Sequence, residues 1–129
     1  MAIFDHLSLG VNNIEQAASF YNDLMRTIGC DALAVSDGFI AYGKTSVQFL
    51  VMLPRDGESA SAGNGTHIAF VASDKETVDR FHQCAVNNGG SCEGEPGERP
   101  EYPLPNVYTA FVRDPFGNKL EIIHNGFSV

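Results

Sequence analysis

The stretches FDHLSLGVNNIEQAASFYNDLM at residues 4–25 and GTHIAFVASDKETVDRF at residues 65–81 repeat one pattern, and this repeat decides the fold. Each begins with a short alternation of apolar and other residues, which is typical of a β-strand, and continues with apolar residues at helical spacing. Asn13 precedes the first helical stripe, and Ser73, with Glu76 at the capping-box offset, precedes the second. The two stretches therefore predict the same strand–helix unit twice.

Three more short strands are predicted after each helix. Apolar runs separated by Gly, Pro and Asp lie at residues 30–35, 39–42 and 47–53, and again at 91–95, 107–113 and 119–124. We therefore predict an α+β fold of two tandem βαβββ modules, with curved mixed sheets around a cleft and the helices on the outside. The modules are residues 1–53 and 66–129 of a single domain, and residues 54–65, rich in Gly, Ser and Ala, form a linker between them.

Composition excludes several classes of function. The chain has 129 residues, 16 acidic and 8 basic side chains and no basic cluster, so nucleic acid is a poor partner. No apolar run approaches the roughly 18 residues of a membrane span, and the first residues do not read as a signal peptide. Three Cys without a CxxC pair favour reduced thiols, and we expect a cytoplasmic protein.

Strand alternation selects four candidate metal ligands. In the predicted strands, apolar residues such as Leu9 and Ile122 point towards the helices, and their sequence neighbours point to the opposite face, towards the cleft. The side chains with ligand chemistry on that face come from the first and last strands of both modules, and they are His6, Gln48, His67 and Glu121.

Two imidazoles, an amide oxygen and a carboxylate are a suitable shell for a divalent ion such as Zn, Ni, Co, Fe or Mn. Positions left open in that shell would suit Lewis-acid chemistry on a substrate that offers two oxygens. The competing interpretation is that each histidine is only a satisfied polar residue, and we adopt it for His82 and His124. Cys84, beside the second helical stripe, is read as a packing residue.

A Pro-rich loop between residues 95 and 108 carries Arg99, Tyr102 and Tyr108. We expect it to close over a small-molecule ligand, with Arg99 binding an anionic group. The alternative is a solvated loop without a ligand.

The segments quoted above, together with FVRDPFGNKLEII at residues 111–123, resemble the vicinal-oxygen-chelate superfamily over nearly the whole chain. This superfamily includes glyoxalase I, methylmalonyl-CoA epimerase, fosfomycin-resistance thiol transferases, bleomycin-binding proteins and extradiol dioxygenases. The resemblance implies metal ligands on the first and last strands of each module, at the four positions selected above. It also implies a homodimer in which modules can pair within one chain or exchange, so that His6 and Gln48 of one subunit would meet His67 and Glu121 of the other.

Gln48 departs from the glyoxalase I pattern, which usually has Glu at this position. Glu121 is then the only ionisable acid of the set and the candidate catalytic residue, which weakens a two-base isomerase mechanism. The expectation is a glyoxalase I-like metal-dependent enzyme with lyase or isomerase chemistry on a small oxygen-chelating or thiol-conjugated substrate. The alternatives are a non-catalytic drug-binding protein of the bleomycin-resistance type, a metal-dependent thiol transferase and an epimerase.

Overall fold

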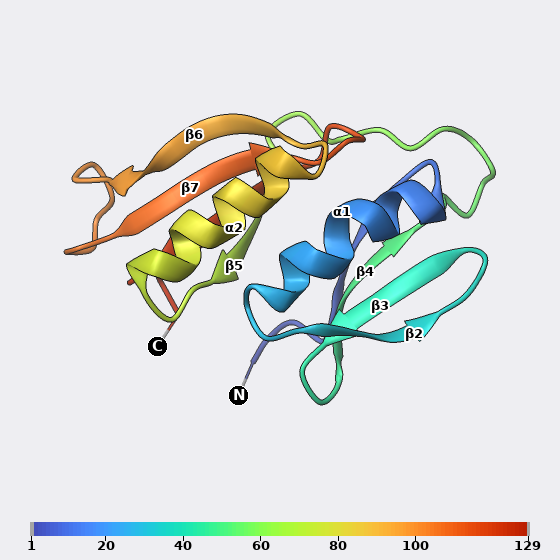
Figure 1. The fold of residues 1–129 in the computed structure, drawn as a ribbon, viewed down its shortest axis with the longest axis horizontal. Coiled ribbons are helices and arrows are strands. Elements are labelled where there is room, and N and C mark those ends of the chain that lie inside the picture. The colour runs from blue at the N-terminus through green and yellow to red at the C-terminus, as the bar shows by residue number, and fades with distance from the viewer. Residues whose placement is uncertain (1, 129) are drawn as a thin grey trace.

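The computed structural model describes residues 2–128, so Met1 and Val129, the outer ends of the two predicted modules, lie outside the described residues. Two helices and eight strands follow one another in the order βαβββ–βαβββ (Figure 1). They are β1 (Leu7–Gly10), α1 (Ile14–Arg26), β2 (Asp31–Val35), β3 (Phe39–Gly43), β4 (Val47–Met52), β5 (Ile68–Val71), α2 (Lys75–Asn87), β6 (Ser91–Glu98), β7 (Tyr108–Arg113) and β8 (Lys119–His124).

The strands form two four-stranded sheets with equivalent topology, β1-β4-β3-β2 and β5-β8-β7-β6. In each sheet the first strand runs parallel to the last, with Leu7 opposite Phe49 and Ile68 opposite Leu120. The other neighbours are antiparallel. The predicted α+β fold with two mixed sheets is confirmed.

Both helices begin at side-chain caps. The Asn13 side chain accepts a hydrogen bond of 2.8 Å from the Gln16 backbone N–H, as the sequence predicted. The second cap is Asp74 and not Ser73, because the Asp74 carboxylate accepts the Thr77 backbone N–H at 2.7 Å. Each helix has 13 residues, and no helix within residues 2–128 is long and apolar enough to cross a membrane.

Strand ends differ from the predicted ones where pairing is the deciding factor. The apolar alternation of the first strand begins before residue 7, but its ladder with β4 begins only at Leu7, opposite Phe49. Conversely, β6 continues to Glu98, through Pro96 of the predicted loop. An edge strand tolerates proline, because one side of its backbone needs no ladder partner.

The two modules share one hydrophobic core through their helix-covered faces. Figure 1 shows α1 and α2 side by side in front of the two sheets, and the two helices are in contact. The rings of Phe49 and Phe70, one from each sheet, meet edge to face with centroids 5.1 Å apart. Gly90 permits the close approach of Phe20, because a Cβ at this glycine would lie 2.7 Å from the Phe20 ring.

A buried carboxylate at the β7–β8 turn joins the modules by hydrogen bonds. Asp114, 4% exposed, accepts bonds from the Tyr21 hydroxyl of α1 and from the backbone N–H groups of Phe116 and Asn118. The Asn118 amide donates both to Asp114 and, at 2.8 Å, to the Gly10 carbonyl at the end of β1. The turn of the second module is therefore fixed to the helix and first strand of the first module.

We expect Tyr21→Phe to lower the free energy of unfolding by about 1.5–3 kcal/mol, because it removes a buried hydrogen bond to a charged acceptor. The matched control is Tyr108→Phe, which removes an exposed tyrosine–aspartate bond, from Tyr108 to Asp79, and should cost less than about 1 kcal/mol. Chemical denaturation of both variants measures the difference. Equal losses would contradict the role assigned to the Tyr21–Asp114 bond.

Candidate functional site

The face of each sheet that carries no helix, here called the helix-free face, holds the candidate ligands. Leu120 and Ile122 of β8 lie in the core, so Glu121 between them points to the helix-free face. His67 directly precedes β5, the parallel neighbour of β8. Its Nε2 lies 3.0 Å from Glu121 Oε1, so the structure brings these two predicted residues into direct contact.

Glu121 is 3% exposed, and its second oxygen, Oε2, is held by two hydroxyl groups. Thr109 Oγ1 lies 2.7 Å and the Tyr102 hydroxyl 2.8 Å from this oxygen. His67 is the only ion-pair partner of Glu121 among the described residues. A buried carboxylate that has neutral hydroxyl donors and one imidazole is well suited to bind a cation or exchange a proton.

The Thr109 hydroxyl lies between the Glu121 carboxylate and the backbone of β8. Its oxygen lies 2.7 Å from Glu121 Oε2 and also 2.7 Å from the Ile122 carbonyl oxygen, and its one proton can be donated to either acceptor. The hydroxyl therefore holds Oε2 beside the strand to which Glu121 belongs.

The Pro-rich loop closes over Glu121 through one of its three predicted residues. The Tyr102 ring stacks on Phe127 with centroids 6.4 Å apart while its hydroxyl donates to Glu121. Burial, and then the hydrogen bond and charge of Glu121, raise the pKa of Tyr102 to about 12. Tyr102 therefore remains a neutral donor to the carboxylate across the physiological pH range.

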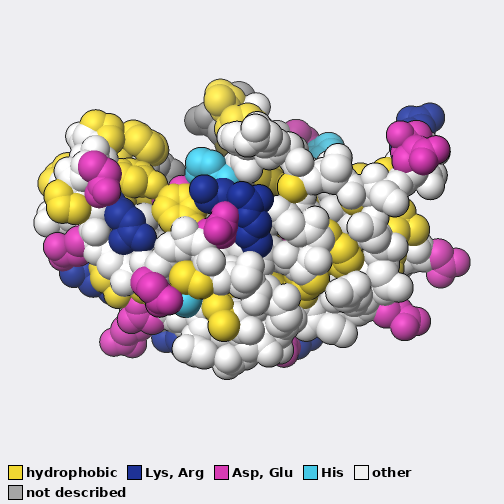
Figure 2. Space-filling view, turned by 90° about the horizontal axis from the view of Figure 1, so that it is seen from above, with side chains coloured by type: hydrophobic (Ala, Val, Ile, Leu, Met, Phe, Trp, Pro, Cys, Tyr) yellow, Lys and Arg dark blue, Asp and Glu magenta, His cyan; other side chains and the backbone are white. Residues whose placement is uncertain are grey.

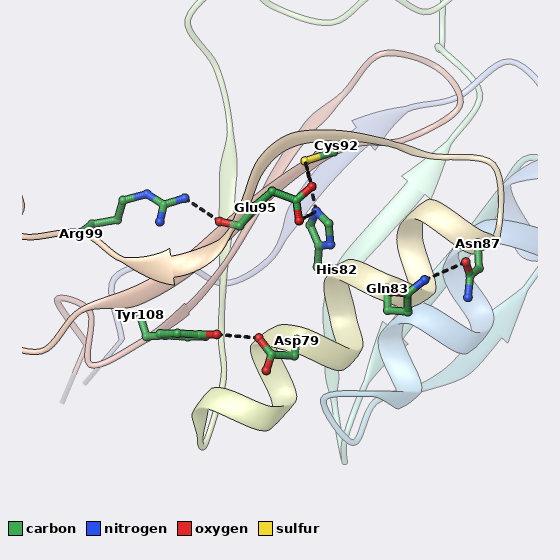
Figure 3. Close-up of polar contacts among 8 residues, drawn as sticks. All are labelled: Asp79, His82, Gln83, Asn87, Cys92, Glu95, Arg99 and Tyr108. Atoms are coloured by element: carbon green, nitrogen blue, oxygen red, sulfur yellow. Dashed lines mark hydrogen bonds and ion pairs between the residues drawn. The ribbon is translucent and has the colours of Figure 1, made fainter.

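The other two loop residues point elsewhere (Figure 3). The Arg99 guanidinium donates to the Glu95 carbonyl oxygen at 2.8 Å, and the Tyr108 hydroxyl donates to Asp79 of α2 at 2.7 Å. Tyr108 thus lies on the helix-covered side. Roles for Arg99 and Tyr108 in ligand binding remain predictions.

His6 and Gln48 lie apart from the pair in the second module. Both line a cavity of about 410 Å³ bounded by residues of β1, β3, β4 and β5 and by the C-terminal end of α1, and neither His67 nor Glu121 is among its lining residues. His6 is exposed and its Nδ1 contacts the Asp5 carboxylate. Within residues 2–128, the ligand atoms of His6, His67 and Glu121 do not all lie within 4.8 Å of one another. One chain thus presents two half-sites.

The molecular surface is hollowed between two lobes, where a histidine side chain lies beside basic side chains (Figure 2). The Lys119 ammonium of β8 lies 5.1 Å from the centroid of the Phe111 ring, and the same ring meets the His67 imidazole edge to face at 5.8 Å. A cation and two aromatic groups thus border the carboxylate, and they would suit an anionic or oxygen-rich ligand.

The His67–Glu121 pair has the spacing of a hydrogen bond, with 3.0 Å between His67 Nε2 and Glu121 Oε1. Two nitrogen or oxygen atoms that bind one ion at right angles, each about 2.1 Å from it, lie about the same distance apart. The spacing is therefore compatible with a shared divalent ion. The donor set of imidazole and carboxylate also suits Zn, Ni, Co, Fe or Mn.

Sequence reasoning missed Thr109, although a signal for it was present. The side chains of Thr109 and Phe111 on β7 point to the same face of the sheet, opposite to the core residues Ala110 and Val112. Because Phe111 pairs with Glu121 in the ladder, the same parity places Thr109 on the helix-free face next to the carboxylate.

Comparison with known proteins agrees with the fold. The profile of the Glyoxalase/Bleomycin resistance protein/Dioxygenase superfamily matches residues 3–122. A crystal structure of a glyoxalase/bleomycin resistance protein from Albidiferax ferrireducens T118 is 34% identical, with a TM-score of 0.88 over 95% of this chain and 99% of that chain. No curated protein matches the sequence.

Two more distant structures share the fold. A glyoxalase-related enzyme from Fulvimarina pelagi is 20% identical, with a TM-score of 0.75 over 97% of this chain and 89% of that chain. A lactoylglutathione lyase from Agrobacterium tumefaciens is 24% identical, with a TM-score of 0.63 over 95% of this chain and 92% of that chain.

We expect Glu121→Gln to lower the pKa of Tyr102 from about 12, because it removes the charged acceptor, while burial keeps the pKa above the ordinary value of about 10. The tyrosinate absorbance of each protein, minus that of its Tyr102→Phe counterpart, isolates this phenol. Tyr108, whose pKa is raised first by its bond to Asp79, is the internal control and should not respond.

The sign of the pH effect on stability follows from the same shift. The pKa of a phenol such as Tyr102 is higher in the folded state than in the unfolded state. Its protonated form therefore stabilises the fold, and its ionised form does not. Its contribution is fully present below about pH 10 and is lost as the pH rises towards 12. An unchanged Tyr102 pKa in Glu121→Gln would contradict the assigned hydrogen bond.

Proposed function

The chain belongs to the Glyoxalase/Bleomycin resistance protein/Dioxygenase superfamily, and from this premise we propose that it is a metal-dependent enzyme of the glyoxalase I-like kind. Its chemistry is of the lyase or isomerase type, on a small oxygen-chelating or thiol-conjugated substrate. The observation that carries this proposal is the buried Glu121 carboxylate, which contacts the His67 imidazole and is oriented by the hydroxyls of Thr109 and Tyr102.

Glu121 acts in this proposal as the single general base and acid. Its ionised form takes a proton from a substrate carbon next to an oxygen-bearing carbon, and its protonated form returns the proton to the neighbouring carbon. Thr109 and Tyr102 keep the carboxylate in one orientation throughout, because both hydroxyls contact Oε2. Gln48 cannot exchange a proton, so no second base takes part.

His67 and Glu121 of one chain, together with His6 and Gln48, would hold the divalent ion. When bound, the ion would act as a Lewis acid towards two substrate oxygens and stabilise the negative charge that develops on them. The 3.0 Å separation of His67 Nε2 and Glu121 Oε1 supports this assignment for the second module.

A second copy of the chain would supply His6 and Gln48. Within one chain, the modules use their helix-covered faces to form a common core, and the Tyr21–Asp114 bond fixes that arrangement. The two half-sites lie apart in this arrangement, and strands β1 and β5 remain at sheet edges. A homodimer in which the first module of each chain faces the second module of its partner would complete two equal sites.

Metal content in mixed dimers tests this assembly. One variant carries His6→Ala and Gln48→Ala, and the other carries His67→Ala and Glu121→Ala. Each variant alone should bind no metal at the site. Co-expressed and purified as a heterodimer through two different tags, they should recover half of the metal by which the wild type exceeds the single variants, because one of the two sites then has all four ligands.

Elemental analysis measures the metal content of the two variant homodimers and of the heterodimer, with a co-expressed pair of wild-type chains as the control. A heterodimer that holds no more metal than the single variants, beside a wild type that holds more, would exclude a site shared between chains. Wild-type protein that neither contains nor rebinds a divalent ion would overturn the metal-dependent function itself.

The catalytic assignment is tested with Glu121→Gln and the hemithioacetal of methylglyoxal and glutathione as the probe substrate. We expect kcat to fall by about 100- to 10,000-fold, the usual contribution of a general acid–base group. Glu101→Gln, an exposed change in the same loop, is the matched control and should keep wild-type kcat. Turnover that survives Glu121→Gln would remove Glu121 from the mechanism.

The cavity beside His6 supports a second candidate, a non-catalytic drug-binding protein. It has a volume of about 410 Å³ and includes the apolar side chains of Phe4, Met25 and Phe70, a lining typical of small-molecule sites. This function predicts tight binding of a small apolar drug-like molecule by metal-free protein, and the same affinity in Glu121→Gln. Loss of binding in Glu121→Gln or on metal removal would favour the enzyme.

A further inference from the structure

Three side chains with metal-ligand chemistry converge on the helix-covered side of the second module (Figure 3). His82 of α2 and Cys92 and Glu95 of β6 form this group, here called the α2–β6 cluster. His82 Nε2 lies 3.2 Å from Cys92 Sγ and 4.0 Å from Glu95 Oε2, and Cys92 Sγ lies 3.4 Å from Glu95 Oε1. Among the described residues, no other group of three His, Cys, Asp or Glu brings its ligand atoms within 4.8 Å.

An irregularity in β6 makes this convergence possible. Residues three apart in a regular strand point to opposite faces, so Cys92 and Glu95 would be separated by the sheet. The ladder shows Cys92 opposite Val112 but Gly94 opposite Phe111, so Glu93 is an extra residue, a β-bulge. The bulge restores Glu95 to the face of Cys92, under α2, where His82 is 7% exposed.

We propose that the α2–β6 cluster is a zinc site, separate from the site on the helix-free face. Imidazole nitrogen, thiolate sulfur and carboxylate oxygen are the three ligand types of protein-bound zinc. Around a tetrahedral zinc ion, such ligand atoms lie about 3.4–3.6 Å apart. His82 Nε2 and Glu95 Oε1 lie 3.2 and 3.4 Å from Cys92 Sγ, and one ligand atom from each of the three residues falls within 4.8 Å of the others. Cys92 and Glu95 are exposed, so water has access to the fourth position.

Among the described residues, the basic side chains near the α2–β6 cluster pair with other groups and not with the Glu95 carboxylate. The neighbouring carboxylates already have basic partners, since Glu93 pairs with Arg113 at 2.7 Å and Glu98 with Lys75 at 3.3 Å. The Arg99 guanidinium binds the backbone carbonyl of Glu95 and not its carboxylate. Within the described part of the chain, His82 is the only ion-pair partner of the Glu95 carboxylate.

A nucleophilic role for Cys92 fits the environment less well. Partial desolvation, and then the hydrogen bond and charge of Glu95, raise the pKa of this thiol, which makes it a poor nucleophile, whereas a bound cation would itself deprotonate it. As a zinc ligand, Cys92 would instead connect β6 to α2. The ligands come from two elements that separate on unfolding, so zinc would stabilise the folded second module.

Cobalt titration of the metal-free full-length protein tests the proposal. A sulfur ligand gives Co²⁺ a thiolate charge-transfer band, which the His6, Gln48, His67 and Glu121 set cannot produce because it contains no sulfur. We expect the band in the wild type, its displacement by Zn²⁺ and its loss in Cys92→Ser. Glu95→Gln should weaken Co²⁺ binding by about tenfold or more, since even outer-shell changes cost that much.

Cys84→Ser is the matched control, because it removes the other cysteine next to α2 and leaves the cluster intact. Both Cys92 and Glu95 are exposed, so their variants should keep the fold, as metal-free melting temperatures would show. Absence of the band in the wild type, or its persistence in Cys92→Ser, would overturn the zinc site. His67→Ala should retain the band, so failure of this site is distinguishable from failure of the proposed function.

Discussion

The Asp114 carboxylate is the interaction on which the arrangement of the two modules depends. It is buried at the β7–β8 turn, and it binds the Tyr21 hydroxyl of the opposite module while Asn118 beside it binds the Gly10 carbonyl. A buried carboxylate is costly unless its hydrogen bonds are complete, so these partners restrict how the modules can pack. Burial, and then the charge of Asp114, also raise the pKa of Tyr21, which stays a neutral donor.

This packing has a direct consequence for function. Because the helix-covered faces make the common core, the helix-free faces of the two sheets remain available for ligands or another chain. Glu121 is then buried by its own loop and strand neighbours, Tyr102 and Thr109, and not by the first module. The His67–Glu121 pair is thus hydrogen-bonded within its own module, and in the proposed function it would supply two of the four metal ligands.

The α2–β6 cluster illustrates how one inserted residue changes chemistry. Alternation along β6 would send Cys92 and Glu95 to opposite faces, and only the extra Glu93 brings them to the same side. The second module therefore has two groups of potential ligands on opposite faces of one sheet. Their different donor atoms, with sulfur present in only one, give them different metal preferences.

The sequence by itself determined the duplicated βαβββ order, the parity of the strands and the Asn13 cap, because periodicity and capping are local properties of the chain. Strand alternation also placed the Glu121 side chain on the face of the sheet opposite to that of Leu120 and Ile122. It did not determine the start of β1 or the length of β6, since strand ends depend on whether the neighbouring strand offers partners.

Only the tertiary structure decided which candidate residues meet. It joined His67 to Glu121, added Thr109 and Tyr102, and left His6 with Gln48 at a separate cavity. It also brought His82, interpreted from the sequence as only a satisfied polar residue, next to Cys92 and Glu95. Such proximities are set by the packing of the modules and by a bulge, and neither leaves a periodic signal in the sequence.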